Sequence, residues 1–154
     1  MTKTEKYEQL AAQTAALCEG ETDTVALMAN VCAAIHHTMG FFWTGFYRVQ
    51  GQQLVLGPFQ GPVACTRIAF GRGVCGTAWQ RRQTVVVPDV ELFPGHIACS
   101  SLSRSEIVVP LMADGQVVAV LDIDSTSPDT FDSTDQHYLE RIAAQMLKQL
   151  TIHN

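Results

Sequence analysis

The stretch that decides the fold runs from His96 to Asp124, HIACSSLSRSEIVVPLMADGQVVAVLDID. It contains a polar loop with Cys99, an apolar run that opens with Glu106, and a second apolar run that closes with two aspartates. An Asp-Gly pair joins the two runs, and it is a strong hairpin signal because both residues tolerate positive φ. The sequence therefore predicts two antiparallel strands, edged with acids and preceded by a cysteine loop.

The acids of the second run should share one face of their strand, because side chains alternate with a period of two. One face would carry Val118, Val120, Asp122 and Asp124, and the other Val117, Ala119, Leu121 and Ile123. Carboxylates beside buried apolar surface are costly unless they meet a cation or have raised pKa values. The strand pattern alone leaves two interpretations open, a functional site or a strand end that emerges into solvent.

Length and composition predict one globular domain over residues 1–154, with 47% hydrophobic and 16% charged residues and no low-complexity tail. The net charge of −5 and the lack of a basic run argue against nucleic-acid binding, which depends on Lys and Arg. No apolar segment approaches the roughly 20 residues of a membrane span, and the polar start does not resemble a secretory signal. We therefore expect a cytoplasmic protein without a membrane partner.

The chain has five cysteines, which is an odd number. In a reducing compartment such a set argues against a structural disulfide framework and leaves room for reactive thiols. Cys18 and Cys32 fall on the apolar faces of predicted helices, where cysteine usually acts as a small hydrophobic residue. The other three are Cys65, Cys75 and Cys99.

Three helices are predicted at the two ends of the chain. The first covers residues 3–18 and ends at Gly20. The second begins near Thr22 or Asp23 and ends at Gly40. Its apolar stripe comprises Val25, Met28, Cys32, Ile35 and Met39. Asp132 and Asp135 make a capping-box-like start for the last helix, whose stripe comprises Leu139, Ile142, Ala143, Met146, Leu147 and Leu150.

Short strands are predicted between the helices. FFWTGFYRV and QLVLGPF form an antiparallel pair, and TRIAFG and TVVVPDV are further strands around a small helix with Cys75. Trp43, Gly45 and Tyr47 share one face, where they either floor a small pocket or are ordinary core aromatics. Gly71-x-Gly73 resembles the start of a phosphate-binding loop, but the third glycine of that fingerprint is missing and no parallel βαβ unit surrounds it. Together the elements predict an α+β fold with a mostly antiparallel sheet.

Residues 90–104, which we name the Cys99 loop, show no clear periodicity and contain Pro94 and Gly95. About fifteen residues without regular structure are uncommon in a compact domain, and such loops are often functional or mobile. His96 precedes Cys99 by three residues and either helps to ionise it or is a solvated loop histidine.

Several segments together resemble a GAF domain over nearly the whole chain: Gly71-Arg-Gly73-Val-Cys-Gly, Ile107-Val-Val-Pro-Leu and Val120-Leu-Asp-Ile-Asp-Ser. The three cysteines, with Trp43, Tyr47, Glu106, Asp122 and Asp124, resemble those of the free methionine-(R)-sulfoxide reductases, which are single GAF domains acting on the free amino acid. The resemblance implies an α+β, GAF-like fold. Its central, mostly antiparallel sheet would have about six strands, with N- and C-terminal helices packed together on one face.

The resemblance also implies a role for each site residue. Cys99 would be the nucleophile, Cys65 the resolving cysteine that forms a disulfide with it, and Cys75 a secondary thiol. The acids Glu106, Asp122 and Asp124 would line the substrate pocket, and Trp43 and Tyr47 would close it around the substrate. No bound metal or cofactor is implied. The expected partners are free methionine-R-sulfoxide, an external thiol reductant such as thioredoxin, and a second copy in a homodimer.

Sulfoxide chemistry agrees with such a site, because reduction needs a thiolate and a nearby acid. Cys99 would attack the sulfur while Glu106, or a protonated member of the Asp122/Asp124 pair, polarises the oxygen. The resulting sulfenic acid would condense with Cys65. One tension remains, because carboxylates around a cysteine should raise its pKa above the usual value of about 8.5.

Two alternatives follow from the same residues. A sensory GAF module would bind a small ligand or nucleotide without catalysis, but it needs neither three loop cysteines nor neighbouring acids. A zinc site could combine Cys65, Cys75, Cys99 and His96, but neither Cys-x-x-Cys nor His-x-x-x-His spacing is present.

Overall fold

The computed structural model describes residues 1–97 and 99–153, with side chains described up to residue 150. Its helices are α1 (Lys3–Cys18), α2 (Thr24–Met39), α3 (Gly73–Arg81) and α4 (Ser133–His153), with one 3-10 turn, η1 (Val90–Leu92). Its strands are β1 (Trp43–Gln50), β2 (Gln53–Gln60), β3 (Arg67–Ala69), β4 (Val85–Val87), β5 (Ser105–Ala113) and β6 (Gln116–Ser125).

The six strands form one sheet in the order β3-β2-β1-β6-β5-β4, and every neighbouring pair is antiparallel. The predicted acidic hairpin is the β5–β6 pair near the middle of this sheet. Its turn residues Asp114 and Gly115 have φ values of 52° and 76°, as a tight hairpin with the strands' right-handed twist requires. The predicted α+β fold with a sheet of about six strands is confirmed.

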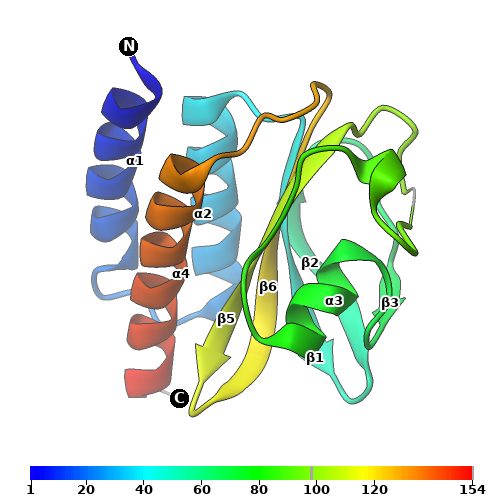
Figure 1. Cartoon of the computed structure of the whole chain (residues 1–154). Coiled ribbons are helices and arrows are strands. Elements are labelled where there is room, and N and C mark those ends of the chain that lie inside the picture. The colour runs from blue at the N-terminus through cyan, green and yellow to red at the C-terminus, as the bar shows by residue number, and fades with distance from the viewer. Residues whose placement is uncertain (98, 154) are drawn as a thin grey trace.

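Helices cover both faces of the sheet. α1, α2 and α4 lie together on one side, and the short α3 lies on the other (Figure 1). Two buried clusters follow from this arrangement. The larger lies under the three long helices and includes Tyr7, Leu10, Ile35, Phe46, Leu121, Ile123, Leu139 and Met146. The smaller lies under α3 and includes Trp43, Tyr47, Leu54, Val74, Val108 and Val120. Because α3 is short, it leaves part of that face to loops.

The helix ends follow the capping residues of the sequence. The Asp23 side chain accepts a hydrogen bond from the backbone N–H of Ala26 at 2.9 Å, and Gly40 ends α2 in the left-handed conformation, as predicted. At α4, Asp135 accepts from the backbone N–H of Asp132 at 2.9 Å and also from the hydroxyl of Tyr7 at 2.6 Å, which joins α1 to α4. Among the described residues, no helix is both long and apolar enough to cross a membrane.

Two predicted side-chain placements are wrong. Val25 was placed on the apolar stripe of α2, but it is 60% exposed because the buried face is centred on Leu27 and Val31. In β6, Val118 is 41% exposed and Val117 packs into the smaller cluster. Leu111 pairs with Ala119 whereas Met112 pairs with Val117, so Val118 is an extra, bulged residue that reverses the facing of the strand start.

Candidate active site

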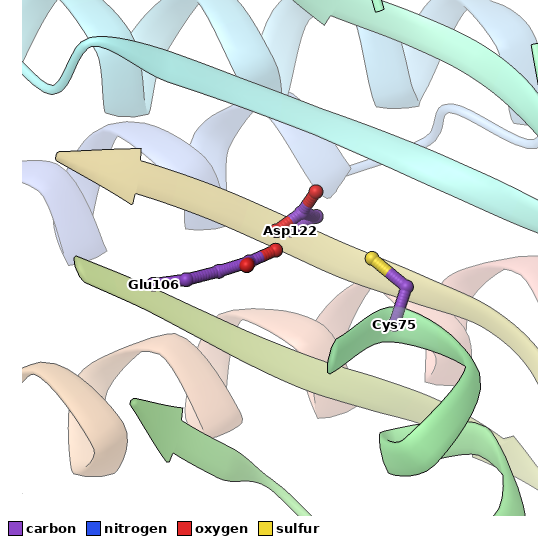
Figure 2. A group of neighbouring side chains, drawn as sticks. All are labelled: Cys75, Glu106 and Asp122. Atoms are coloured by element: carbon purple, nitrogen blue, oxygen red, sulfur yellow. The ribbon is translucent and has the colours of Figure 1, made fainter. Parts of the chain in front are cut away.

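Three carboxyl groups meet on the sheet face that α3 covers. The hairpin register sets Glu106 of β5 directly opposite Asp124 of β6, and Asp122 opposite Val108. Glu106 and Asp122 are each 6% exposed. Figure 2 shows their carboxyl groups pointing toward one another and toward the sulfur of Cys75 on α3. One ligand atom from each of these three residues lies within 4.8 Å of the other two.

Burial controls the protonation of this cluster. It raises the pKa of Glu106 well above its usual value, and the charges of Asp122 and Asp124 raise it further. Burial and the Asp122 charge likewise raise the pKa of Asp124 well above normal. The pKa of Asp122 is raised by burial, but hydrogen bonds from Glu106 and Cys75 oppose this shift. Burial therefore favours the protonated form of all three carboxyl groups, and least strongly that of Asp122.

Cys75 lies in the first turn of α3 and is 3% exposed. Burial raises its pKa well above normal, and the charges of Asp122 and Glu106 add to the effect. The side chain is thus a protonated thiol that donates a hydrogen bond to Asp122. Gly73, which begins α3, lines the same cavity as these acids. Carboxyl groups beside Gly73 are poor partners for a phosphate, which argues against the phosphate-binding loop considered from the sequence.

Cys65 and Cys99 form a disulfide, with their Cα atoms 5.5 Å apart. The pairing implied by the family resemblance is therefore present in the structure. It joins the Cys99 loop to the segment between β2 and β3. The alternative zinc site from three cysteines and His96 is not assembled, because two of its sulfurs are bonded to each other.

Trp43 and Tyr47 connect β1 to the segment that carries Cys65. The indole Nε1 of Trp43 donates to the carbonyl of Pro62 at 3.0 Å, and the Tyr47 hydroxyl donates to the carbonyl of Cys65 at 2.8 Å. The Trp43 indole lies over Gly45, where a Cβ atom would overlap the ring. The space above this glycine is thus filled by Trp43 itself.

A cavity of about 50 Å³ lies between these groups. Of the eight predicted site residues, those lining it are Trp43, Tyr47, Cys75, Cys99, Glu106, Asp122 and Asp124. The eighth, Cys65, is held next to them by the disulfide. The sequence therefore identified residues that the fold brings together from β1, α3, the Cys99 loop, β5 and β6.

Two further residues of the Cys99 loop contact the acids. Ser103 makes a hydrogen bond with Asp124, and no sequence pattern distinguished it from the neighbouring serines. His96 Nε2 lies 3.9 Å from Glu106 Oε1. Burial lowers the pKa of His96 and raises the pKa of Glu106, so both shifts disfavour an ion pair between the two side chains.

Comparisons with known proteins follow the same pattern. A family model of the GAF domain matches residues 21–147. The GAF domain-containing protein A of Dictyostelium discoideum is 57% identical over 91% of this chain and 89% of its own. The free methionine-R-sulfoxide reductase of Escherichia coli is 47% identical over 97% of this chain and 92% of its own.

A solved structure is also similar throughout. The X-ray structure of free methionine-R-sulfoxide reductase from Neisseria meningitidis in complex with its substrate superposes with a TM-score of 0.96 at 51% identity. The match covers 98% of this chain and 92% of that one.

Proposed function

The chain belongs to the free methionine-(R)-sulfoxide reductase family of GAF domains, and from this premise we propose that it reduces free L-methionine-(R)-sulfoxide to L-methionine. The observation that carries the proposal is the Cys65–Cys99 disulfide beside a cavity lined by three carboxyl groups, of which Glu106 and Asp122 are buried. A disulfide between two loop cysteines is the state in which a thiol-dependent reduction would leave the enzyme.

We assign the first chemical step to Cys99, whose thiolate attacks the sulfoxide sulfur after the disulfide has been reduced. A protonated carboxyl group, Glu106 or Asp124, delivers its proton to the sulfoxide oxygen. The protonated oxygen is transferred from the substrate sulfur to the sulfur of Cys99. Methionine is released, and Cys99 becomes a sulfenic acid. The raised pKa values of both carboxyl groups support this assignment, because they favour the protonated form that donates the proton.

The second step belongs to Cys65, whose thiol displaces water from the Cys99 sulfenic acid and forms the disulfide. An external dithiol then reduces that disulfide and returns both cysteines to thiols. Cys75 acts as a secondary thiol. Its buried, protonated state supports a part outside the first attack.

Selectivity for the free amino acid comes from its two charges. Asp122, whose pKa is raised less than those of Glu106 and Asp124, binds the α-ammonium group, and backbone N–H groups of the Cys99 loop bind the α-carboxylate. A peptide bond on either side would remove the matching charge. Trp43 packs on the S-methyl group and Tyr47 closes the pocket beside it.

The remaining parts of the proposal concern the cellular setting. The chain would be one GAF domain that acts in the cytoplasm as a homodimer, with thioredoxin as its dithiol reductant. The GAF model matches residues 21–147, and α1, which precedes the matched region, packs in the same buried cluster as α4; both observations support a single domain. No metal or prosthetic group has a step in this chemistry.

The test is consumption of free methionine sulfoxide by the purified, dithiothreitol-reduced protein, with the R and S epimers measured separately. We expect turnover of the R epimer, and its loss in Cys99→Ser. Cys32→Ser is the matched control, because that buried cysteine donates to the carbonyl of Pro58 away from the cavity and should leave turnover unchanged. A folded, reduced wild type that leaves the R epimer untouched would exclude the proposed activity.

A further inference from the structure

We propose that Cys75, Glu106 and Asp122 bind a Zn²⁺ ion when Cys65 and Cys99 are joined in their disulfide. The site goes beyond the proposed function, since the reductase reaction uses no metal. It also differs from the zinc site considered from the sequence, which required the two cysteines that the disulfide removes.

The geometry of the three donors fits one ion. Their ligand atoms lie within 4.8 Å of one another, and Figure 2 shows all three side chains directed to a common point between α3 and the β5–β6 hairpin. Two ligands of a tetrahedral zinc ion are roughly 3.4–3.6 Å apart, given metal–ligand distances of about 2.0–2.3 Å. Small side-chain movements would therefore bring the sulfur and both oxygens into coordination.

One of the three proposed ligand residues has an unpartnered oxygen atom. Oδ1 of Asp122 is buried and has no hydrogen-bond partner among the residues that the structure describes. Buried oxygens are normally paired, and this one belongs to a side chain that is 6% exposed and lines the cavity. The cavity of about 50 Å³ exceeds the roughly 10–15 Å³ that one water needs, so it can hold an ion together with a coordinated water molecule.

The chemistry of the donors selects the kind of ion. Mg²⁺ and Ca²⁺ prefer sites made of oxygen ligands, whereas zinc combines thiolate, imidazole and carboxylate. Zinc binding would release the protons of Cys75 and Glu106 to solvent and place a double positive charge among three negative ligands. A fourth donor is close, because His96 Nε2 lies 3.9 Å from Glu106 Oε1.

The oxidation state isolates this site from the other cysteines. In the disulfide form Cys65 and Cys99 cannot bind a metal through thiolates, and Cys18 and Cys32 are buried in the larger cluster across the sheet. Among the described cysteines, Cys75 is the free thiol beside the acids. An ion here would occupy the carboxyl groups that we assign to the substrate. Zinc and the free amino acid would therefore compete for the same site in the oxidised protein.

The test uses the full chain with its disulfide intact, in buffer free of thiols. Equilibrium dialysis against Zn²⁺ followed by metal analysis should give one ion per chain, and Cys75→Ser should lose it. Cys32→Ser is the matched control and should retain the ion. Glu106→Gln should weaken binding by at least the roughly tenfold that loss of an outer-shell partner costs.

Cobalt supplies a spectroscopic readout of the same site. Co²⁺ bound by the wild type should show a thiolate-to-metal charge-transfer absorption, which Cys32→Ser keeps and Cys75→Ser loses. Zinc retention by Cys75→Ser equal to that of the wild type, or a wild type without this absorption, would overturn the site. Both measurements are independent of catalysis, so they stand apart from the test of the reductase activity.

Discussion

Replacing Glu106 with glutamine should stabilise the fold, and the gain should increase with pH. Glu106 is buried opposite Asp124, and burial together with its acidic neighbours raises its pKa well above the ordinary value of 4.5. A carboxyl group whose pKa is higher in the folded than in the unfolded state favours folding only while protonated. Its contribution is complete below the unfolded pKa and is lost as pH rises toward the folded pKa.

The size of the effect follows from linkage. Each pH unit between the unfolded and folded pKa values costs the wild type about 1.4 kcal/mol of unfolding free energy. The difference between Glu106→Gln and wild type should therefore be small near pH 4.5 and should grow with pH at that rate until the folded wild-type carboxyl group ionises. No discount for solvent screening applies, because the side chain is buried.

Urea unfolding of the oxidised proteins between pH 4.5 and 8 would measure this difference. Glu91→Gln is the control, because Glu91 is exposed on the η1 turn and its replacement removes the same charge without a burial effect. A Glu106→Gln variant whose stability difference is constant with pH, or that is less stable than wild type at pH 8, would refute the assignment of Glu106 as a protonated buried acid.

Three further changes have definite expected outcomes. Tyr47→Phe removes the hydroxyl that donates to the Cys65 carbonyl, so formation of the disulfide should slow. Dimedone should then trap more Cys99 sulfenic acid while KM stays similar. Unchanged trapping would contradict a positioning role for Tyr47. Gly45→Ala places a Cβ against the overlying indole and should cost about 1–3 kcal/mol in thermal unfolding, as overpacking does, whereas an unchanged Tm would contradict this packing. Val118→Thr on the bulge should change stability by less than about 0.5 kcal/mol, while Val117→Thr should destabilise clearly. Equal effects in urea unfolding would argue against the bulge.

The fold was largely predictable because its main signals are local. Asp114-Gly115 defines the central hairpin, and Asp23 and Gly40 delimit α2. The bulge at Val118 escaped prediction because a strand's period assumes regular pairing, and an extra residue depends on how two strands meet. The predicted placement of Val25 on the buried stripe was wrong because α2 has more apolar residues than its buried face can accept.

The site was predictable in its members but not in its arrangement. Period two places Asp122 and Asp124 on one face, yet only the hairpin register sets Glu106 opposite Asp124. Cys75 meets these acids because α3 packs across the sheet, which local sequence does not encode. The hydrogen bond from Tyr47 to the Cys65 carbonyl likewise depends on tertiary structure, since it is a contact between a strand and a distant loop.

The arrangement also answers the electrostatic tension that the sequence raised. Three acids beside a cysteine should suppress its thiolate, and in the structure the cysteine that hydrogen-bonds to the cluster is Cys75, whose pKa they raise. Cys99 sits instead on an exposed loop, linked to Cys65. Because burial favours the protonated forms of Glu106 and Asp124, it reduces the negative charge that these groups add near Cys99. Burial makes these carboxyl groups costly for stability. The same burial supports their proposed role as proton donors, because it limits the negative charge that would disfavour the Cys99 thiolate.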